Sequence, residues 1–189
     1  MNKISKVLFG LALVLPVTAS AADKFTLDPA HSAVVFKISH MGMSDFYGRF
    51  NDVSGSFVLD KEHADKSTAE VKIKADSVDT HEAKRDDHLK SPDFFNTKQF
   101  PNITFASTSV KQLSEKEYEV AGNLNIKGVS KPVTLKFVKG GEGTDPWGKY
   151  RIGFNTSITI KRSDFGMNFM SDKLGDDVTL LISAEALRS

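Results

Sequence analysis

The chain has 189 residues, of which 25 are Lys or Arg and 24 are Asp or Glu, so its formal net charge is +1. This balance argues against a nucleic-acid partner, which needs a basic stripe on the protein surface. The chain contains no cysteine, which excludes disulfides, thiol catalysis and cysteine-ligated metals.

Residues 1–21 are typical of a secretory signal peptide. Lys3 and Lys6 form a basic head, residues 7–17 are almost wholly apolar, and small residues precede the expected cleavage site. The apolar run is too short to span a bilayer comfortably, and an uncleaved anchor is the alternative interpretation. We therefore expect cleavage, export to the periplasm in a Gram-negative source, and one domain over residues 22–189.

From Lys24 onward, apolar and polar residues alternate with a period of two, as in Val34, Phe36 and Ile38. The pattern recurs seven or eight times between turn signals, which predicts half-buried antiparallel strands. The expected fold is all-β, with about eight strands and one or two short helices. Periodicity leaves a closed barrel and a sandwich both open.

Aromatic residues bear on what fills such a fold. The chain has 14 phenylalanines, and only Phe9 belongs to the predicted signal peptide. Many of the others fall on inward strand positions. A barrel of eight strands holds packed side chains or one slender ligand, so a phenylalanine-lined tube suits an apolar guest. The alternative is a core filled by its own aromatic side chains.

Residues 79–107 combine a charged half with an aromatic half. We expect a helix from His81 to Lys90, capped by Asp79 or Thr80, because the Ser91-Pro92 pair disfavours helix beyond it. Spacings of four and three would place the side chains of His81, Arg85 and His88 on one helix face. That face could contact the head group of a ligand. The alternative is a lid helix whose Arg85 and Asp86 bond to neighbouring loops.

No catalytic motif is complete. His81-Glu82 begins like a zinc-protease helix, but Arg85 stands where the second histidine is needed. No G-x-S-x-G nucleophile motif occurs, and the adjacent Asp86 and Asp87 would point apart on a helix. We expect neither an enzyme nor a metal site, because no spacing brings the five histidines together.

Five segments together resemble the YceI family, and the resemblance spans the whole chain after the signal. They are Asp28-Pro29-Ala30-His31-Ser32, residues 85–89, residues 100–105, residues 124–133 and Arg162-Ser163-Asp164-Phe165-Gly166. The resemblance implies a lipocalin-like antiparallel β-barrel, usually periplasmic, that holds a polyisoprenoid or similar long-chain lipid.

On this basis we expect a carrier of a polyisoprenoid or isoprenoid-quinone lipid, bound non-covalently and without another cofactor. The expected lining is Phe36, Phe57, Phe94, Phe95, Phe105, Phe137 and Phe154, with His40, Arg85 and His88 near the head group. Two alternatives stay open: a structural or stress-associated protein with a self-filled core, and an electron-transfer accessory that carries a quinone. The oligomeric state is open, a homodimer included, as is transient contact with inner-membrane proteins or the membrane surface.

Overall fold

A computed structural model describes residues 22–189, so the predicted signal peptide lies outside the described residues. Eleven strands form one antiparallel sheet. They are β1 Asp23–Leu27, β2 Ala33–His40, β3 Ser44–Phe50, β4 Val53–Leu59, β5 Thr68–Lys74, β6 Val78–Asp79, β7 Asn102–Gln112, β8 Glu117–Ile126, β9 Val129–Thr144, β10 Tyr150–Lys161 and β11 Leu174–Arg188. The helices are α1 Ala83–Lys90 and the short 3₁₀ turns η1 Pro29–His31, η2 Ala64–Lys66, η3 Ala75–Ser77 and η4 Arg162–Phe165.

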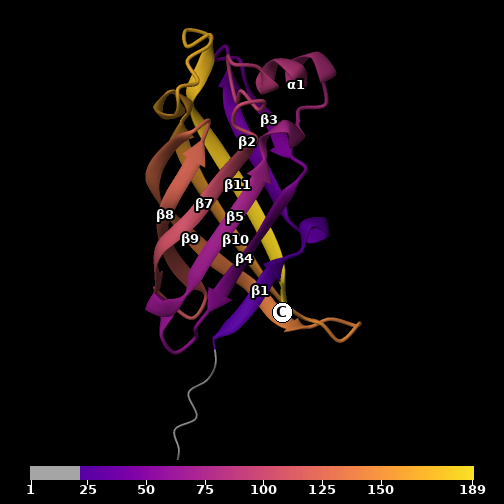
Figure 1. Cartoon of the computed structure of the whole chain (residues 1–189), viewed down its shortest axis with the longest axis vertical. Coiled ribbons are helices and arrows are strands. Elements are labelled where there is room, and N and C mark those ends of the chain that lie inside the picture. The colour runs from indigo at the N-terminus through magenta and orange to yellow at the C-terminus, as the bar shows by residue number, and fades with distance from the viewer. Residues whose placement is uncertain (1–21) are drawn as a thin grey trace, which may run out of the picture.

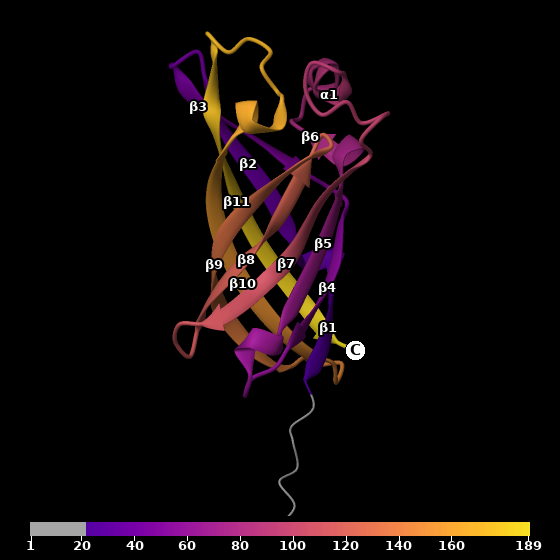
Figure 2. The same ribbon diagram turned by 60° about the vertical axis from the view of Figure 1, so that its left-hand side comes forward.

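The sheet closes into a barrel (Figures 1 and 2). Strands run β1-β4-β5-β7-β8-β9-β10-β11, and β1 pairs back onto β11 with Phe25 opposite Arg188, so the ring has eight strands. β2 continues the line of β1 along β11, beyond the turn η1, and pairs with β3 on its other side. The predicted all-β barrel is confirmed, and the sandwich alternative is wrong.

The two ends of the barrel differ. One end carries both ends of the described chain, the hairpin between β7 and β8, and the hairpin between β9 and β10 (Figure 1). The other end carries α1, the β2–β3 turn and the loop between η4 and β11 (Figure 2). We call these the terminal end and the helix end.

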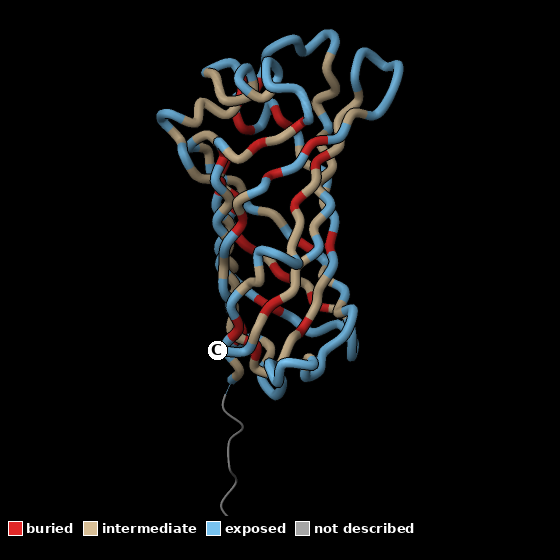
Figure 3. The backbone as a smooth tube through the Cα atoms, turned by 90° about the vertical axis from the view of Figure 1, so that its right-hand side faces the viewer, coloured by how far each residue is buried: buried red, intermediate tan, exposed pale blue. Residues whose placement is uncertain are grey.

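Buried apolar residues form two clusters inside the barrel, and Figure 3 marks the buried positions in red along the backbone. The cluster at the terminal end includes Phe25 and Ile152, each 1% exposed, and the ring of Phe25 stacks on that of Phe57 with centroids 4.9 Å apart. The other cluster lies toward the helix end and includes Phe50 and Phe165. Each end of the barrel therefore has its own group of buried apolar residues.

The helix begins later than the sequence predicts. Its N-cap is Glu82, whose carboxylate accepts the Lys84 N–H, and neither Asp79 nor Thr80 caps it. Asp79 instead accepts the N–H of His81, which adopts a left-handed backbone with φ of 65°. His81 therefore lies outside the helix and does not share a face with Arg85 and His88. No helix in residues 22–189 is long and apolar enough to cross a membrane.

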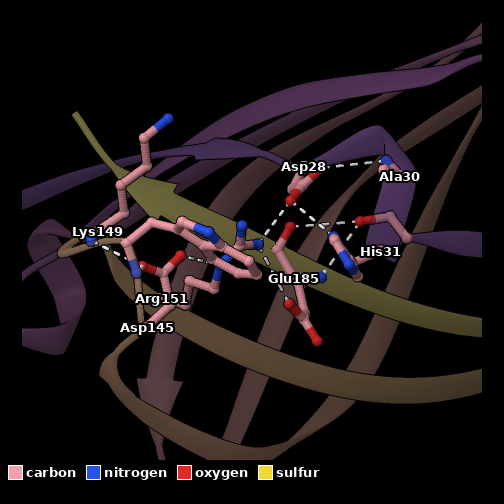
Figure 4. A network of polar contacts seen from close by, with 9 residues as sticks. Asp28, Ala30, His31, Asp145, Lys149, Arg151 and Glu185 are labelled. Atoms are coloured by element: carbon pink, nitrogen blue, oxygen red, sulfur yellow. Dashed lines mark hydrogen bonds and ion pairs between the residues drawn. The ribbon is translucent and has the colours of Figure 1, made fainter.

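An ion-pair cluster joins β10 to the β1–β2 junction and β11 (Figure 4). Arg151 bonds to Asp28 at 2.6 Å, to Asp145 at 2.8 Å and to Glu185 at 3.4 Å. β9 extends through Thr144, and residues 145–149 form the hairpin tip before β10. Asp145 organises that tip by accepting the N–H groups of Trp147 and Lys149.

Candidate functional site

A cavity of about 480 Å³ lies inside the barrel. Its wall reaches from Leu59 and Tyr118 in the terminal-end cluster to Phe94 and Phe169 at the helix end. The wall is built from inward faces of strands around the ring, because period-two alternation directs every second side chain inward. It is overwhelmingly apolar, and its few polar side chains include His40, Arg85, His88 and Arg162 at the helix end and Ser56, Thr68 and Glu70 on β4 and β5.

Many inward side chains are only half-buried. Val71, Val133, Ile158 and Leu180 sit on the cavity wall and keep part of their surface accessible. In a filled core such residues would contact neighbours on all sides. Their apolar surface instead faces the cavity, so the strand interiors do not fill the tube.

The seven phenylalanines expected as lining all lie on this wall: Phe36, Phe57, Phe94, Phe95, Phe105, Phe137 and Phe154. The ring of Phe154 makes edge-on contacts with those of Phe57 at 5.9 Å and Phe137 at 6.4 Å. Phe95 makes an edge-on contact with Phe50 at 5.5 Å nearer the helix end. The structure thus brings these residues into one compartment, and their contact with a lipid stays a prediction.

An aromatic cluster lines the cavity where it reaches the surface at the helix end. His88, Phe94 and Phe169 contact one another edge-on, with ring centroids 4.9 to 5.5 Å apart. His88 also bonds through Nε2 to Asp93 at 2.8 Å. Phe94 is buried whereas Phe169 is partly exposed. We call this opening the mouth.

Arg85 and His40 lie at the same end and on the same wall. Arg85 donates from Nε to Thr80 Oγ1 at 2.8 Å and from Nη2 to Thr80 O at 2.9 Å, and its guanidinium stacks 4.3 Å from the Phe46 ring. The three expected head-group residues are therefore together at the mouth. Arg85 also holds its own helix against the preceding segment, as the alternative interpretation expects.

Arg162 is a wall residue that the sequence analysis missed as a site residue. It is 3% exposed, and it donates hydrogen bonds to the carbonyl oxygens of Met167, Phe169, Leu174 and Gly175. Burial lowers the pKa of its guanidinium below the ordinary value. Its role is to shape the loop that carries Phe169. Phe46 and Phe50 also line the cavity, and the sequence analysis did not name them. The period-two alternation of their strand could have found them, because it directs both side chains inward.

Within residues 22–189, no three His, Asp or Glu side chains lie close enough together to hold a metal ion. In the same part of the chain, every buried side-chain nitrogen and oxygen has a hydrogen-bond partner. At the mouth, the side chains of Arg85, His88 and Arg162 all bond to the protein itself.

A family model described as a YceI-like domain matches residues 25–186. The UPF0312 protein of Pseudomonas aeruginosa is 43% identical over 180 residues, which cover 95% of this chain and 94% of that protein. The chain belongs to the YceI family.

Solved structures agree with this assignment. The YceI protein of Campylobacter jejuni superposes with a TM-score of 0.69 at 34% identity, over 80% of this chain and 90% of that one. A polyisoprenoid-binding domain from Saccharophagus degradans superposes with a TM-score of 0.65 at 16% identity, over 87% and 98% of the two chains. The second likeness shows a shared fold.

Two segments that carry the YceI resemblance meet at the mouth. Residues 85–89 supply Arg85 and His88, while residues 162–166 supply Arg162 and the left-handed Gly166 that turns the chain into the mouth loop. Lys127 ties the two regions together, because its Nζ donates to Pro92 O at 2.8 Å and to Gly166 O at 3.1 Å. These family segments therefore build the opening of the cavity.

Proposed function

We propose that this protein binds a long-chain polyisoprenoid lipid, or an isoprenoid quinone, inside its barrel and carries it in the periplasm. The observation that supports the proposal is the continuous apolar cavity between the terminal end and the mouth. A slender flexible hydrocarbon matches such a tube better than a compact polar metabolite does, because the wall offers apolar contact along its length.

Burial of the tail supplies the binding free energy. Each methylene removed from water contributes about 0.8 kcal/mol, so an isoprene unit of five carbons contributes roughly 4 kcal/mol. Association and ordering cost about 4–15 kcal/mol. A tail of four or more units, at about 16 kcal/mol or more, therefore exceeds this whole range, whereas a single unit only reaches its lower limit. The proposal accordingly expects selection by tail length.

The head group lies at the mouth in this proposal. His40, Arg85 and His88 are polar or charged side chains that the wall presents there beside the aromatic cluster, together with the buried Arg162. A polar head can keep contact with water at this end while the tail enters the tube. Phe36, Phe57, Phe95, Phe105, Phe137 and Phe154 then contact the tail, and Phe94 lies at the level of the head.

The competing idea of a self-filled core is disfavoured by the half-exposed inward side chains. The family assignment and the similarity to a polyisoprenoid-binding domain favour a binding protein over an enzyme. A quinone cargo used for electron transfer would occupy the same tube. Identifying the bound molecule would distinguish an electron-transfer role from passive lipid carriage.

The test is organic extraction of the full-length gene product purified from the periplasm, followed by mass spectrometry. A stoichiometric prenyl or quinone species supports the proposal and names the cargo. If the extract is clean, prenyl alcohols of increasing length are added to the protein, and the melting temperature should rise with length. A clean extract together with an unchanged melting temperature would overturn the proposal.

A further inference from the structure

The helix end carries exposed apolar side chains on two neighbouring loops. Met41 and Met43 lie in the β2–β3 turn, and Phe169 and Met170 lie in the loop between η4 and β11. Met43 is 80% exposed. The loops are joined, because Met41 N–H donates to Lys173 O at 2.8 Å. We call these four residues the apolar rim, and Figure 2 shows both loops at the same end of the barrel.

Backbone preference does not explain two of the rim methionines. Met41 and Met170 adopt left-handed backbone conformations, with φ of 56° and 50°. Glycine or asparagine is the usual choice there, because a larger side chain is disfavoured in this conformation. A methionine at such a position that also leaves much of its side chain in water indicates that its side chain has a surface to contact.

The apolar rim is continuous with the cavity. Phe169 and Met170 also line the cavity wall, so apolar surface runs without interruption from the interior to the outside. A long hydrocarbon that leaves a bilayer for the cavity must otherwise cross water with its whole tail exposed, which is strongly unfavourable. A rim that enters the bilayer removes this step.

The net charge of the two loops indicates which kind of partner they can contact. Lys173 stands next to Asp172, and Asp45 at the base of the β2–β3 turn pairs with Lys37 at 2.9 Å. The exposed charges of the loops therefore nearly cancel and provide no complement to a strongly acidic or basic protein. Flexible methionines and a phenylalanine suit the headgroup boundary of a lipid bilayer, where apolar side chains insert reversibly.

We propose that the apolar rim docks on the surface of a lipid bilayer and points the mouth toward its hydrocarbon. The inference rests on the proposed lipid cargo and assigns the face through which that cargo enters and leaves. Contact is driven by the apolar side chains and is insensitive to the fraction of anionic lipid.

The chain contains its own orientation reporter. Trp147 is the only tryptophan, it is 81% exposed, and it lies in the β9–β10 hairpin at the terminal end, opposite the rim. The protein is mixed with phosphatidylcholine vesicles that have brominated acyl chains and contain no prenyl lipid. In the native protein, the emission of Trp147 should stay unquenched. The variant Trp147→Phe/Met43→Trp should show quenched, blue-shifted emission.

A second measurement uses sedimentation with plain phosphatidylcholine vesicles. Met41→Asn/Met43→Ser, which changes two rim residues outside the cavity wall, should weaken partitioning about tenfold, since both positions lose apolar contact and asparagine tolerates the left-handed backbone of residue 41. Leu113→Ser removes an exposed apolar side chain at the terminal end and should leave partitioning unchanged.

Three outcomes would overturn the inference. The emission of native Trp147 could be quenched, the emission of the Met43→Trp variant could stay unquenched, or the protein could form a dimer in solution that the rim variant abolishes. The rise in melting temperature that added prenyl alcohol causes is measured on the same variants in the absence of vesicles. If that rise persists while docking fails, only the docking inference is wrong. If docking occurs and the rise is absent, the proposed cargo is wrong.

Discussion

Phe36 lies over Gly48 across the β2–β3 pair. The two residues are directly opposite in register, and a side-chain carbon at position 48 would clash with Phe36 Cζ. Gly48 thus provides the space that this aromatic ring occupies on the cavity wall.

Gly48→Ala should therefore lower the free energy of unfolding by about 1–3 kcal/mol, because the added methyl overpacks the site. Gly141→Ala is the matched control, since no atom lies within 4 Å of its added carbon. Thermal denaturation measures both. The double change Gly48→Ala/Phe36→Leu should recover part of the loss, and a Gly48→Ala variant as stable as the native protein would contradict this packing.

The Arg151 cluster predicts the response to acid. Arg151, and after it His31, lower the pKa of Asp28 from 3.8 to about 2 (Figure 4). A carboxyl whose pKa is lower in the folded state stabilises the fold above pH 3.8, and this contribution is lost as the pH falls toward 2. Arg151→Met should lower the melting temperature at neutral pH and flatten its dependence on pH within that window.

Lys136→Met is the control for charge removal, because it breaks a surface pair with Glu117. Its melting temperature should stay close to that of the native protein, as exposed ion pairs contribute little. Equal pH profiles for Arg151→Met and the native protein would show that the cluster does not hold Asp28 ionised.

The cavity can be blocked in its middle. Leu180 faces the cavity from β11, opposite Ile158 of β10, whereas Leu181 points outward and is 42% exposed. Leu180→Trp should fold, because its indole enters open space, and should reduce the melting-temperature rise produced by a long prenyl alcohol. Leu181→Trp adds the same group outside the barrel and should leave that rise intact. Equal responses from the two variants would place the ligand elsewhere.

We predict that Arg162 keeps the loop between η4 and β11 ordered. Arg162→Met should lower the free energy of unfolding by about 2–4 kcal/mol, because carbonyl oxygens that now accept from a buried guanidinium lose their partner. Trypsin should also cleave faster after Lys173 in the folded protein. Lys161→Met, which removes only surface contacts with Asp177 at 3.0 Å and Asp176 at 3.9 Å, should change neither measurement.

His88 tests the head-group assignment. His88→Ala should cost at most about 1 kcal/mol of stability, because the side chain is exposed and its pair with Asp93 is a surface contact. It should also change the relative binding of prenyl alcohol, prenyl phosphate and quinone with equal tails. If only stability changes, α1 is a structural cover and the head group lies elsewhere.

The alternation of apolar and polar residues from Lys24 onward was sufficient to predict strands, an all-β fold and the inward phenylalanines. This succeeded because the direction of a side chain in a strand depends on the nearest backbone alone. The predicted start of α1 was wrong for a different local reason. The left-handed backbone of His81 delays the start of the helix to Ala83. Capping preferences did not reveal that turn.

The strand period, the aromatic load and the family segments could all be read from the order of the residues. Three further features emerge only in the folded barrel: β1 closes onto β11, the side chains leave a cavity, and Arg85, His88, Arg162 and Phe169 meet at one mouth. Closure and cavity volume depend on how all strands pack together around the ring. The mouth joins segments more than 70 residues apart in the chain, and no local pattern encodes such a contact.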